Sequence, residues 1–248
     1  MAGAPRAAVA IYEALATHHP GADTELEFRT AFELLIATVL SAQSTDRRVN
    51  EVTPALFARY PGPQALAGAA QDDVETLIHS TGFFRQKAKA VIGLATALVD
   101  DHGGEVPADM NALVALPGVG RKTANVVLGH ALGVPGFPVD RHVLRVAARL
   151  GLIHTDDAVK AEGVLTALFP AALWTRVSDT LILHGRRICG PTPSCDLCHA
   201  RQLCPHAVTG TRRARPPVTR AKAPAAASTP GRRPKAAAAK RPTARPRR

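Results

Sequence analysis

The sequence predicts an all-α protein, and three observations carry this prediction. Apolar residues recur with the three- and four-residue spacing of a helix face in several segments. No segment shows the regular alternation of apolar and polar residues that marks a half-buried strand. Turn sequences rich in Gly and Pro, such as YPGP at 60–63 and LGVPGFP at 132–138, separate the helical segments.

Four segments show the helical spacing, in order along the chain. The positions that form the four faces are Phe32, Leu35, Ile36, Val39 and Leu40; Ala124, Val127, Leu128 and Ala131; Val143, Val146, Ala147 and Leu150; and Val177, Leu181, His184 and Ile188. The second and third faces each follow a turn and a polar start. Only a few residues separate these two helices, so we expect a sharp bend between them.

The length and composition allow a folded body of one large or two small domains. The chain has 248 residues, of which 46% are apolar. Its first residues lack the basic start and apolar run of a signal peptide, and no stretch approaches the roughly 18 apolar residues of a membrane span. We therefore expect a cytoplasmic protein with no membrane partner.

The positive charge is concentrated at the C-terminal end. Of the 31 Lys and Arg residues, 13 lie in 211–248, where there is no Asp or Glu, which leaves 18 basic against 20 acidic residues in the rest. This Ala- and Pro-rich tail has little to bury, so we expect it to be disordered. It suits non-specific attachment to nucleic acid, although a merely solubilising tail has the same composition.

A glycine-containing turn precedes the second helix in LPGVGRKTANVVL, residues 116–128. Gly118 and Gly120 permit positive φ and close backbone approach, and the amides that follow are free helix-start donors for a phosphate oxygen. This spacing is that of a helix-hairpin-helix element, which grips the DNA backbone. An ordinary turn between two helices remains an alternative.

Lys122 lies in the first turn of this helix, beside Arg121. The helix dipole, the neighbouring charge and any burial there would penalise the ammonium form and free the amine to attack carbon. A charged lysine that contacts phosphate is the alternative interpretation. Asp140 in PVDRHVLRV suits the N-cap of the next helix, and it could also accept a proton from Lys122 or stabilise positive charge on a sugar.

All four cysteines lie in 16 residues, as C-x5-C-x2-C-x5-C from Cys189 through Cys195 and Cys198 to Cys204. Disulfides are disfavoured without a secretory signal, so the spacing indicates a metal site. A single CxxC with one outlying cysteine on each side favours an iron–sulfur cluster, but zinc remains open. His199 and His206 are nearby alternative zinc ligands.

Together, LPGVGRKTANVVL, VDRHVLRV, ELLIATVLSAQSTDRRVN and the cysteine run resemble the endonuclease III family of DNA repair glycosylases, over roughly residues 7–208. The resemblance implies two all-α lobes with DNA between them. A six-helix lobe would span 24–134, a cluster lobe would combine 1–23 with 135–208, and the basic tail would follow at 209–248.

The resemblance also implies a [4Fe–4S] cluster held by the four cysteines, and we expect the protein to act as a monomer. One departure is that the first cysteine loop, GPTPS, has five residues where the family has six. A shorter loop could still ligate a cluster.

The implied activity is excision of oxidised pyrimidines from duplex DNA, followed by cleavage of the abasic strand. Lys122 matches the nucleophile that forms a Schiff base, and Asp140 matches the assisting carboxylate. Because the adenine-excising branch usually lacks this lysine, Lys122 favours the bifunctional branch. The alternatives are a monofunctional glycosylase or lyase-only relative of the same fold, and a non-catalytic helix-hairpin-helix DNA-binding protein.

The resemblance places further residues against DNA. Gln43 matches the residue that fills the gap left by a flipped nucleotide, and Phe83 matches a wedge position where the family has leucine. Gly118, Gly120, Arg121 and His142 are expected at the DNA backbone. Phe83 and Phe84 could instead both be core residues, and we expect this of at least one. In a bacterium the protein would associate with the nucleoid.

Overall fold

The computed structural model describes residues 3–210, so the basic tail expected at 209–248 lies almost entirely outside the described residues. The described part is helical and contains no strand, which confirms the all-α prediction. The α-helices are α1 (Gly3–His18), α2 (Ala31–Leu40), α3 (Asp46–Arg59), α4 (Pro63–Ala67), α5 (Gln71–Ile78), α6 (Phe84–His102), α7 (Met110–Ala115), α8 (Arg121–Ala131), α9 (Arg141–Arg149), α10 (Ala158–Leu168), α11 (Trp174–Arg187) and α12 (Pro205–Gly210). Short 3₁₀ turns lie at His79–Thr81 (η1), Ala171–Leu173 (η2), Cys195–Leu197 (η3) and Arg201–Leu203 (η4).

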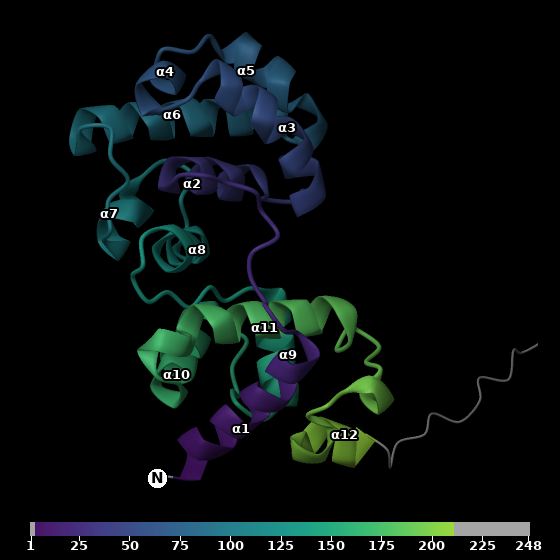
Figure 1. Cartoon of the computed structure of the whole chain (residues 1–248). Coiled ribbons are helices and arrows are strands. Elements are labelled where there is room, and N and C mark those ends of the chain that lie inside the picture. Colours follow the sequence, from purple (N-terminus) through teal and green to yellow (C-terminus); the bar gives the residue numbers. More distant parts are fainter. Residues whose placement is uncertain (1–2, 211–248) are drawn as a thin grey trace, which may run out of the picture. The chain divides into compact units, whose positions relative to one another are not determined.

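Side chains at the helix starts fix several of these boundaries. Thr30 accepts a hydrogen bond from the backbone N–H of Glu33 at the start of α2, and Thr45 accepts one from Arg48 at the start of α3. α2 is buried on almost all sides, because α3, α6 and α8 pack around it. It therefore forms the centre of a first group of helices, α2 to α8. Figure 1 shows this group above a second group, which consists of α1 and α9 to α12.

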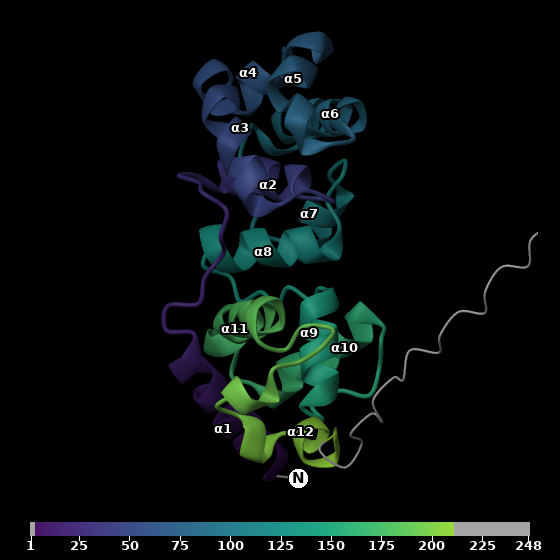
Figure 2. The same cartoon turned by 90° about the vertical axis from the view of Figure 1, so that its right-hand side faces the viewer.

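The buried apolar residues form two clusters. The first is built from α2 to α8 and runs from Leu26 to Leu128. The second combines Ala8, Ile11 and Leu15 of α1 with residues from Phe137 onward, so that α1 packs with α10 and α11. Figure 2 shows α1 in the same lower group of helices as α9, α10, α11 and α12. Both clusters belong to one compact unit. We propose that each cluster is the core of one lobe, with the bounds 24–134 and 1–23 plus 135–208 that the sequence suggests.

The two groups of helices meet where α8 packs against α11. Gly129 of α8 lies so close to α11 that a Cβ there would be 2.3 Å from Oγ1 of Thr175. The same Thr175 hydroxyl donates a hydrogen bond to the carbonyl oxygen of Gly136, at 3.0 Å. A Cβ on Gly136 would in turn lie 2.3 Å from the backbone oxygen of Asn125. The sharp bend expected between α8 and α9 therefore depends on glycine at these close contacts.

Candidate active site and metal centre

The turn at 116–120 joins α7 to α8. Gly118 has a φ of +77°, which favours glycine, and a Cβ there would lie 3.3 Å from Cβ of Ala90. Gly120 is the N-cap of α8 with a φ of −94°, so the expected positive φ applies to Gly118 alone. No side chain caps the start of α8. The first amides of α8 are therefore unblocked, as binding of a phosphate oxygen requires.

Lys122 lies one residue inside α8, and its side chain is exposed. The sequence left partial burial of Lys122 open, and the structure shows this residue exposed. Among the described residues, no hydrogen bond or ion pair engages its ammonium group. Lys122 is thus free to meet a ligand.

Arg121, unlike Lys122, forms an ion pair with another of the described residues. Its Nε and Nη2 donate to the two carboxylate oxygens of Glu162 in α10, both at 2.8 Å. The hydrogen bonds that Arg121 donates to Glu162 raise the pKa of Arg121. This bidentate pair joins α8 to α10, so the guanidinium expected at the DNA backbone is held by a carboxylate.

Asp140 is the N-cap of α9, as the sequence predicts. Its Oδ1 accepts hydrogen bonds from the backbone N–H of His142, at 2.7 Å, and of Val143, at 2.9 Å. Capping therefore uses one carboxylate oxygen and leaves Oδ2 available. His142 follows in the first turn, where burial lowers its pKa and its Nδ1 lies 3.0 Å from Nη2 of Arg145.

Lys122 and Asp140 line the same cavity, although 18 positions separate them in the sequence. Thr38 of α2 and Ser41, which follows the end of α2, contribute to its wall, as do residues of α11. The cavity thus lies between helices of the two clusters. A lysine amine and a carboxylate in one cavity can support nucleophilic attack coupled to proton transfer.

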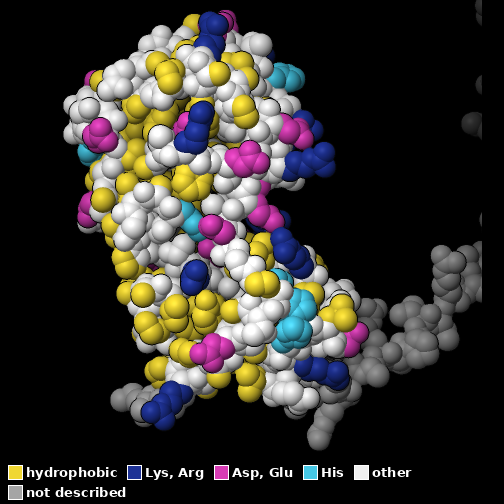
Figure 3. Space-filling model, viewed as in Figure 1, with side chains coloured by type: hydrophobic (Ala, Val, Ile, Leu, Met, Phe, Trp, Pro, Cys, Tyr) yellow, Lys and Arg dark blue, Asp and Glu magenta, His cyan; other side chains and the backbone are white. Residues whose placement is uncertain are grey.

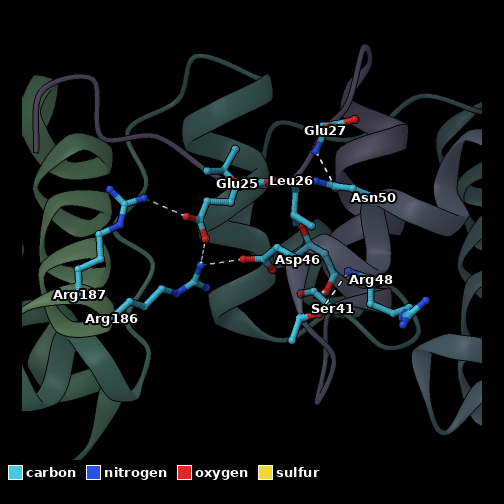
Figure 4. A network of polar contacts seen from close by, with 12 residues as sticks. Glu25, Leu26, Glu27, Ser41, Asp46, Arg48, Asn50, Arg186 and Arg187 are labelled. Atoms are coloured by element: carbon cyan, nitrogen blue, oxygen red, sulfur yellow. Dashed lines mark hydrogen bonds and ion pairs between the residues drawn. The ribbon is translucent and has the colours of Figure 1, made fainter. Parts of the chain in front are cut away.

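An open groove borders this cavity, and the two share Glu25, Asp46 and Arg186. Arg186 of α11 donates to Oδ2 of Asp46 at 2.9 Å and also to Glu25, which further accepts from Arg187 (Figure 4). Arg141 and His142 line the same groove. No local pattern in the sequence marks Glu25, Asp46 or Arg186, because their ion pairs join residues more than 130 positions apart.

Gln43 and Phe83 share an unusual backbone conformation. They are the two non-glycine residues with positive φ in the part of the chain that the structure describes, at 54° and 48°. Such strain costs on the order of 1–3 kcal/mol and concentrates at functional sites. Both side chains are exposed, and Phe83 is 61% exposed. Phe83 is therefore not a core residue, whereas Phe84 packs partly buried against the first cluster, as expected of one of the two.

The four cysteines are free thiols that line one cavity near the end of α11. Cys204 is buried and the other three are half-buried. Burial raises the pKa of the Cys195 and Cys198 thiols. Binding a metal would therefore also stabilise their thiolate forms, which are the forms that act as ligands.

Arg149 of α9 holds the shortened first cysteine loop. Its guanidinium donates to the carbonyl oxygens of Gly190, at 2.6 Å, and Pro191, at 3.0 Å, and lies 3.3 Å from Sγ of Cys189. The five-residue loop GPTPS can thus keep Cys189 on the cavity wall.

The spacing of the sulfurs can be compared with what a zinc ion and an iron–sulfur cluster require. A tetrahedral zinc ion with Zn–S bonds of about 2.3 Å needs sulfurs within about 4 Å of one another. In the described part of the chain, no three of the four sulfurs lie within 4.8 Å of one another. This wider spacing fits a cluster, in which each thiolate binds a different iron atom.

The histidines near the cysteines have other contacts. His199 lies 3.2 Å from Oγ1 of Thr17, and its ring packs against His18. The ring that approaches a cysteine is instead that of His184, whose Nε2 lies 3.5 Å from Sγ of Cys198. His206 lines the cysteine cavity. Figure 3 shows histidine side chains gathered near the end of α1 on one face of the molecule.

The chain is similar to known DNA repair proteins over most of its length. The family model described as HhH-GPD superfamily base excision DNA repair protein matches residues 36–170. Endonuclease III of Synechocystis sp. is 48% identical over 209 residues, which cover 84% of this chain and 95% of the relative. Endonuclease III of Bacillus subtilis is 43% identical, with 75% of this chain and 85% of the relative covered.

Solved structures agree with these relatives. The structure of a trapped endonuclease III–DNA covalent intermediate is similar with a TM-score of 0.79 and 40% identity, covering 84% of this chain and 99% of that chain. A thermostable thymine-DNA glycosylase, at 22% identity and a TM-score of 0.73, shares the fold. None of the described helices is long and apolar enough to cross a membrane. The chain belongs to the endonuclease III family, within the HhH-GPD superfamily of base excision DNA repair proteins.

Proposed function

We propose that the protein is a bifunctional DNA glycosylase and AP lyase that excises oxidised pyrimidines from duplex DNA. The observation that carries this proposal is the placement of Lys122 and Asp140 on one cavity between the two helix clusters. Family membership supports the same activity, since relatives include an endonuclease III trapped as a covalent intermediate with DNA. The substrate is double-stranded DNA in the cytoplasm, and association with a nucleoid stays a prediction.

The proposed reaction begins when a damaged nucleotide leaves the base stack and enters the cavity. Duplex DNA covering the cavity removes water from Lys122, which favours the neutral amine, and Oδ2 of Asp140 accepts the proton. The amine attacks C1′, the bond from C1′ to the base breaks, and the base leaves with the electron pair and takes up a proton. Asp140 also stabilises the positive charge that forms at C1′.

The second half of the proposed reaction cuts the strand. The sugar ring opens to give a Schiff base between C1′ and Nζ of Lys122. Loss of a C2′ proton then expels the 3′ phosphate by β-elimination, and water releases the enzyme. The positive charge of the imine stabilises the carbanion character at C2′, so the lysine serves both halves of the reaction.

The DNA contacts we propose follow from exposure and backbone geometry. The unblocked amides after Gly118 and Gly120 bind a phosphate, and His142 faces the backbone from the open groove. Gln43 fills the gap in the stack, and Phe83 acts as the wedge, with a larger surface than the leucine of the family. Arg121 serves DNA binding indirectly, because Glu162 holds its guanidinium against α10.

The test of the substrate class is release of free base under single-turnover conditions. We expect release from a duplex with one thymine glycol, and none from a duplex with adenine opposite 8-oxoguanine. An intact duplex of the same sequence is the control. Binding of all three duplexes without release of any base would instead favour the non-catalytic alternative, and cleavage of abasic DNA alone would favour a lyase-only relative.

The proposed cofactor is a [4Fe–4S] cluster held by Cys189, Cys195, Cys198 and Cys204. When bound, it would supply a covalent clasp for the C-terminal part of the second cluster of helices, in which these cysteines take part. Arg149 positions the first loop, and its guanidinium lies beside Sγ of Cys189.

Metal analysis tests this cofactor. Protein purified without oxygen should contain about four iron and four sulfide per chain, with broad visible absorption that is lost in Cys198→Ala. Zinc at one per chain, with no sulfide, would contradict the proposal. The matched control is Ser194→Ala, which changes a neighbouring residue of the loop and leaves all four thiols in place.

A further inference from the structure

His130 of α8 joins three segments of the chain and is part of neither the proposed catalytic pair nor the cysteine cavity. Its Nδ1 lies 3.0 Å from Oδ1 of Asp23, in the connector between α1 and α2. Its Nε2 lies 3.4 Å from Oδ1 of Asp179, in α11. The side chains of His130 and Asp179 are only 6% and 8% exposed, whereas that of Asp23 is 72% exposed.

The two carboxylates determine the charge of this ring. A neutral imidazole has one N–H and could donate to only one carboxylate, whereas an imidazolium donates to both. Burial lowers the pKa of His130, but the hydrogen bonds and charges of Asp179 and Asp23 outweigh burial, and the net pKa is raised. The remaining charged groups on the two cavities that border the ring are Glu25, Asp46, Lys122, Asp140, Arg176 and Arg186.

The position of this ring matters because α11 contacts both α8 and the segment that precedes Asp140. Through Asp179, α11 holds the His130 end of α8, the helix whose first turn carries Lys122. The neighbouring Ser178 is fully buried and donates a hydrogen bond to the carbonyl oxygen of Pro138, at 2.5 Å. Pro138 lies two residues before Asp140. Consecutive residues of one helix therefore fix the segments that carry the two proposed catalytic groups.

We infer that His130, as an imidazolium held between Asp23 and Asp179, is a positioning residue that sets Lys122 against Asp140 across the boundary between the two helix clusters. This inference rests on the proposed roles of Lys122 and Asp140. The close approach of Gly129 to Thr175 supports it, because α8 and α11 are in contact beside this histidine. His130 takes no part in the reaction itself. Only the placement of the Lys122 amine relative to the Asp140 carboxylate depends on the ring.

The sign of the pH dependence follows from the raised pKa. The ion pairs contribute fully below the pKa of a histidine in the unfolded chain, and their contribution is lost as pH rises through the folded-state pKa. A neutral substitute such as His130→Gln removes this contribution. The difference between the wild type and His130→Gln should therefore be large at pH 6 and small at pH 9.

The experiment measures borohydride trapping on an abasic duplex, under single-turnover conditions, for the full chain from pH 6 to pH 9. At each pH, the trapping rate of the wild type is divided by that of the variant. This ratio cancels the effects of the titratable groups that the two proteins share. We expect His130→Gln to be on the order of tenfold slower at pH 6, less than the 10²-fold that a 1 Å misplacement can cost, and to approach the wild type at pH 9. His102→Gln, which alters a histidine with no side-chain partner in the described chain, is the matched control and should follow the wild type throughout.

Thermal unfolding provides a readout that does not depend on activity. The melting temperature of His130→Gln should fall below that of the wild type by about 2–4 °C at pH 6, with a smaller difference at pH 9. Asp23→Asn, which alters the exposed partner, should show a smaller shift of the same sign. The inference would be overturned if neither the ratio of the trapping rates nor the difference in melting temperature between the wild type and His130→Gln changed with pH.

Two further outcomes distinguish the positioning role of His130 from a cation site and from failure of the proposed function. If Mn²⁺ added after dialysis against EDTA stabilises the wild type but not Asp179→Asn, the three residues form a cation site and the inference is wrong. If Lys122→Gln traps as fast as the wild type, the proposed function fails, whereas loss of trapping in Lys122→Gln together with a flat His130→Gln ratio overturns only the role of His130.

Discussion

Lys122→Gln should abolish cleavage of abasic DNA while leaving DNA binding largely intact. Glutamine keeps the length and polarity of the side chain but has no amine to form a Schiff base. Loss of a covalent nucleophile lowers single-turnover rates by roughly 10⁴- to 10⁶-fold. Because Lys122 is exposed and has no partner within the described chain, the substitution should not alter the melting temperature.

The matched control for this prediction is Lys160→Gln, which removes an exposed positive charge from α10. This variant should cut abasic DNA at the wild-type rate, with at most a small change in the salt dependence of binding. Cleavage by Lys122→Gln within about tenfold of the wild type would mean that another group is the nucleophile.

Substitutions of Asp140 should separate its structural role from its catalytic role. Asparagine caps a helix about as well as aspartate, so Asp140→Asn should keep the hydrogen bonds to His142 and Val143 and leave the free energy of unfolding nearly unchanged. It removes the charge and the proton acceptor, and base release should fall by about 10²- to 10⁴-fold. Denaturant unfolding and single-turnover base release measure the two effects on the same protein.

Asp140→Ala completes the comparison, because it removes both the cap and the carboxylate. It should lower the free energy of unfolding by about 1 kcal/mol and lower base release at least as much as Asp140→Asn. If Asp140→Asn releases base at the wild-type rate while Asp140→Ala loses stability, then Asp140 is a helix cap only.

Much of the fold could be predicted from local patterns in the sequence. The apolar spacing of 32–40, 124–131 and 143–150 matches α2, α8 and α9, because one face of each of these helices packs against a core. Asp140 was identifiable as a cap, since an acidic residue directly before a helical pattern has few other local uses. The four cysteines were identifiable as a group because their clustering is itself a local signal.

The contacts between distant segments could not be predicted. The sequence indicates Arg121 as a DNA contact, yet its partner Glu162 lies 41 residues away and no spacing rule links the two. His130 carries no sequence signal, because its importance depends on Asp23 and Asp179 meeting at one ring. The exposure of Phe83 follows from its left-handed backbone at the start of α6, which the pattern TGFFRQKA does not specify.

The most direct test of the central claim is to identify the residue that becomes attached to DNA. The protein would be reduced with borohydride on a duplex with one thymine glycol and, in parallel, on an abasic duplex, and the adduct would be digested and mapped by mass spectrometry. A bifunctional glycosylase predicts adducts from both duplexes, with the mass of the sugar remnant on Lys122. An adduct on any other residue, or no adduct on either duplex despite binding, would contradict it.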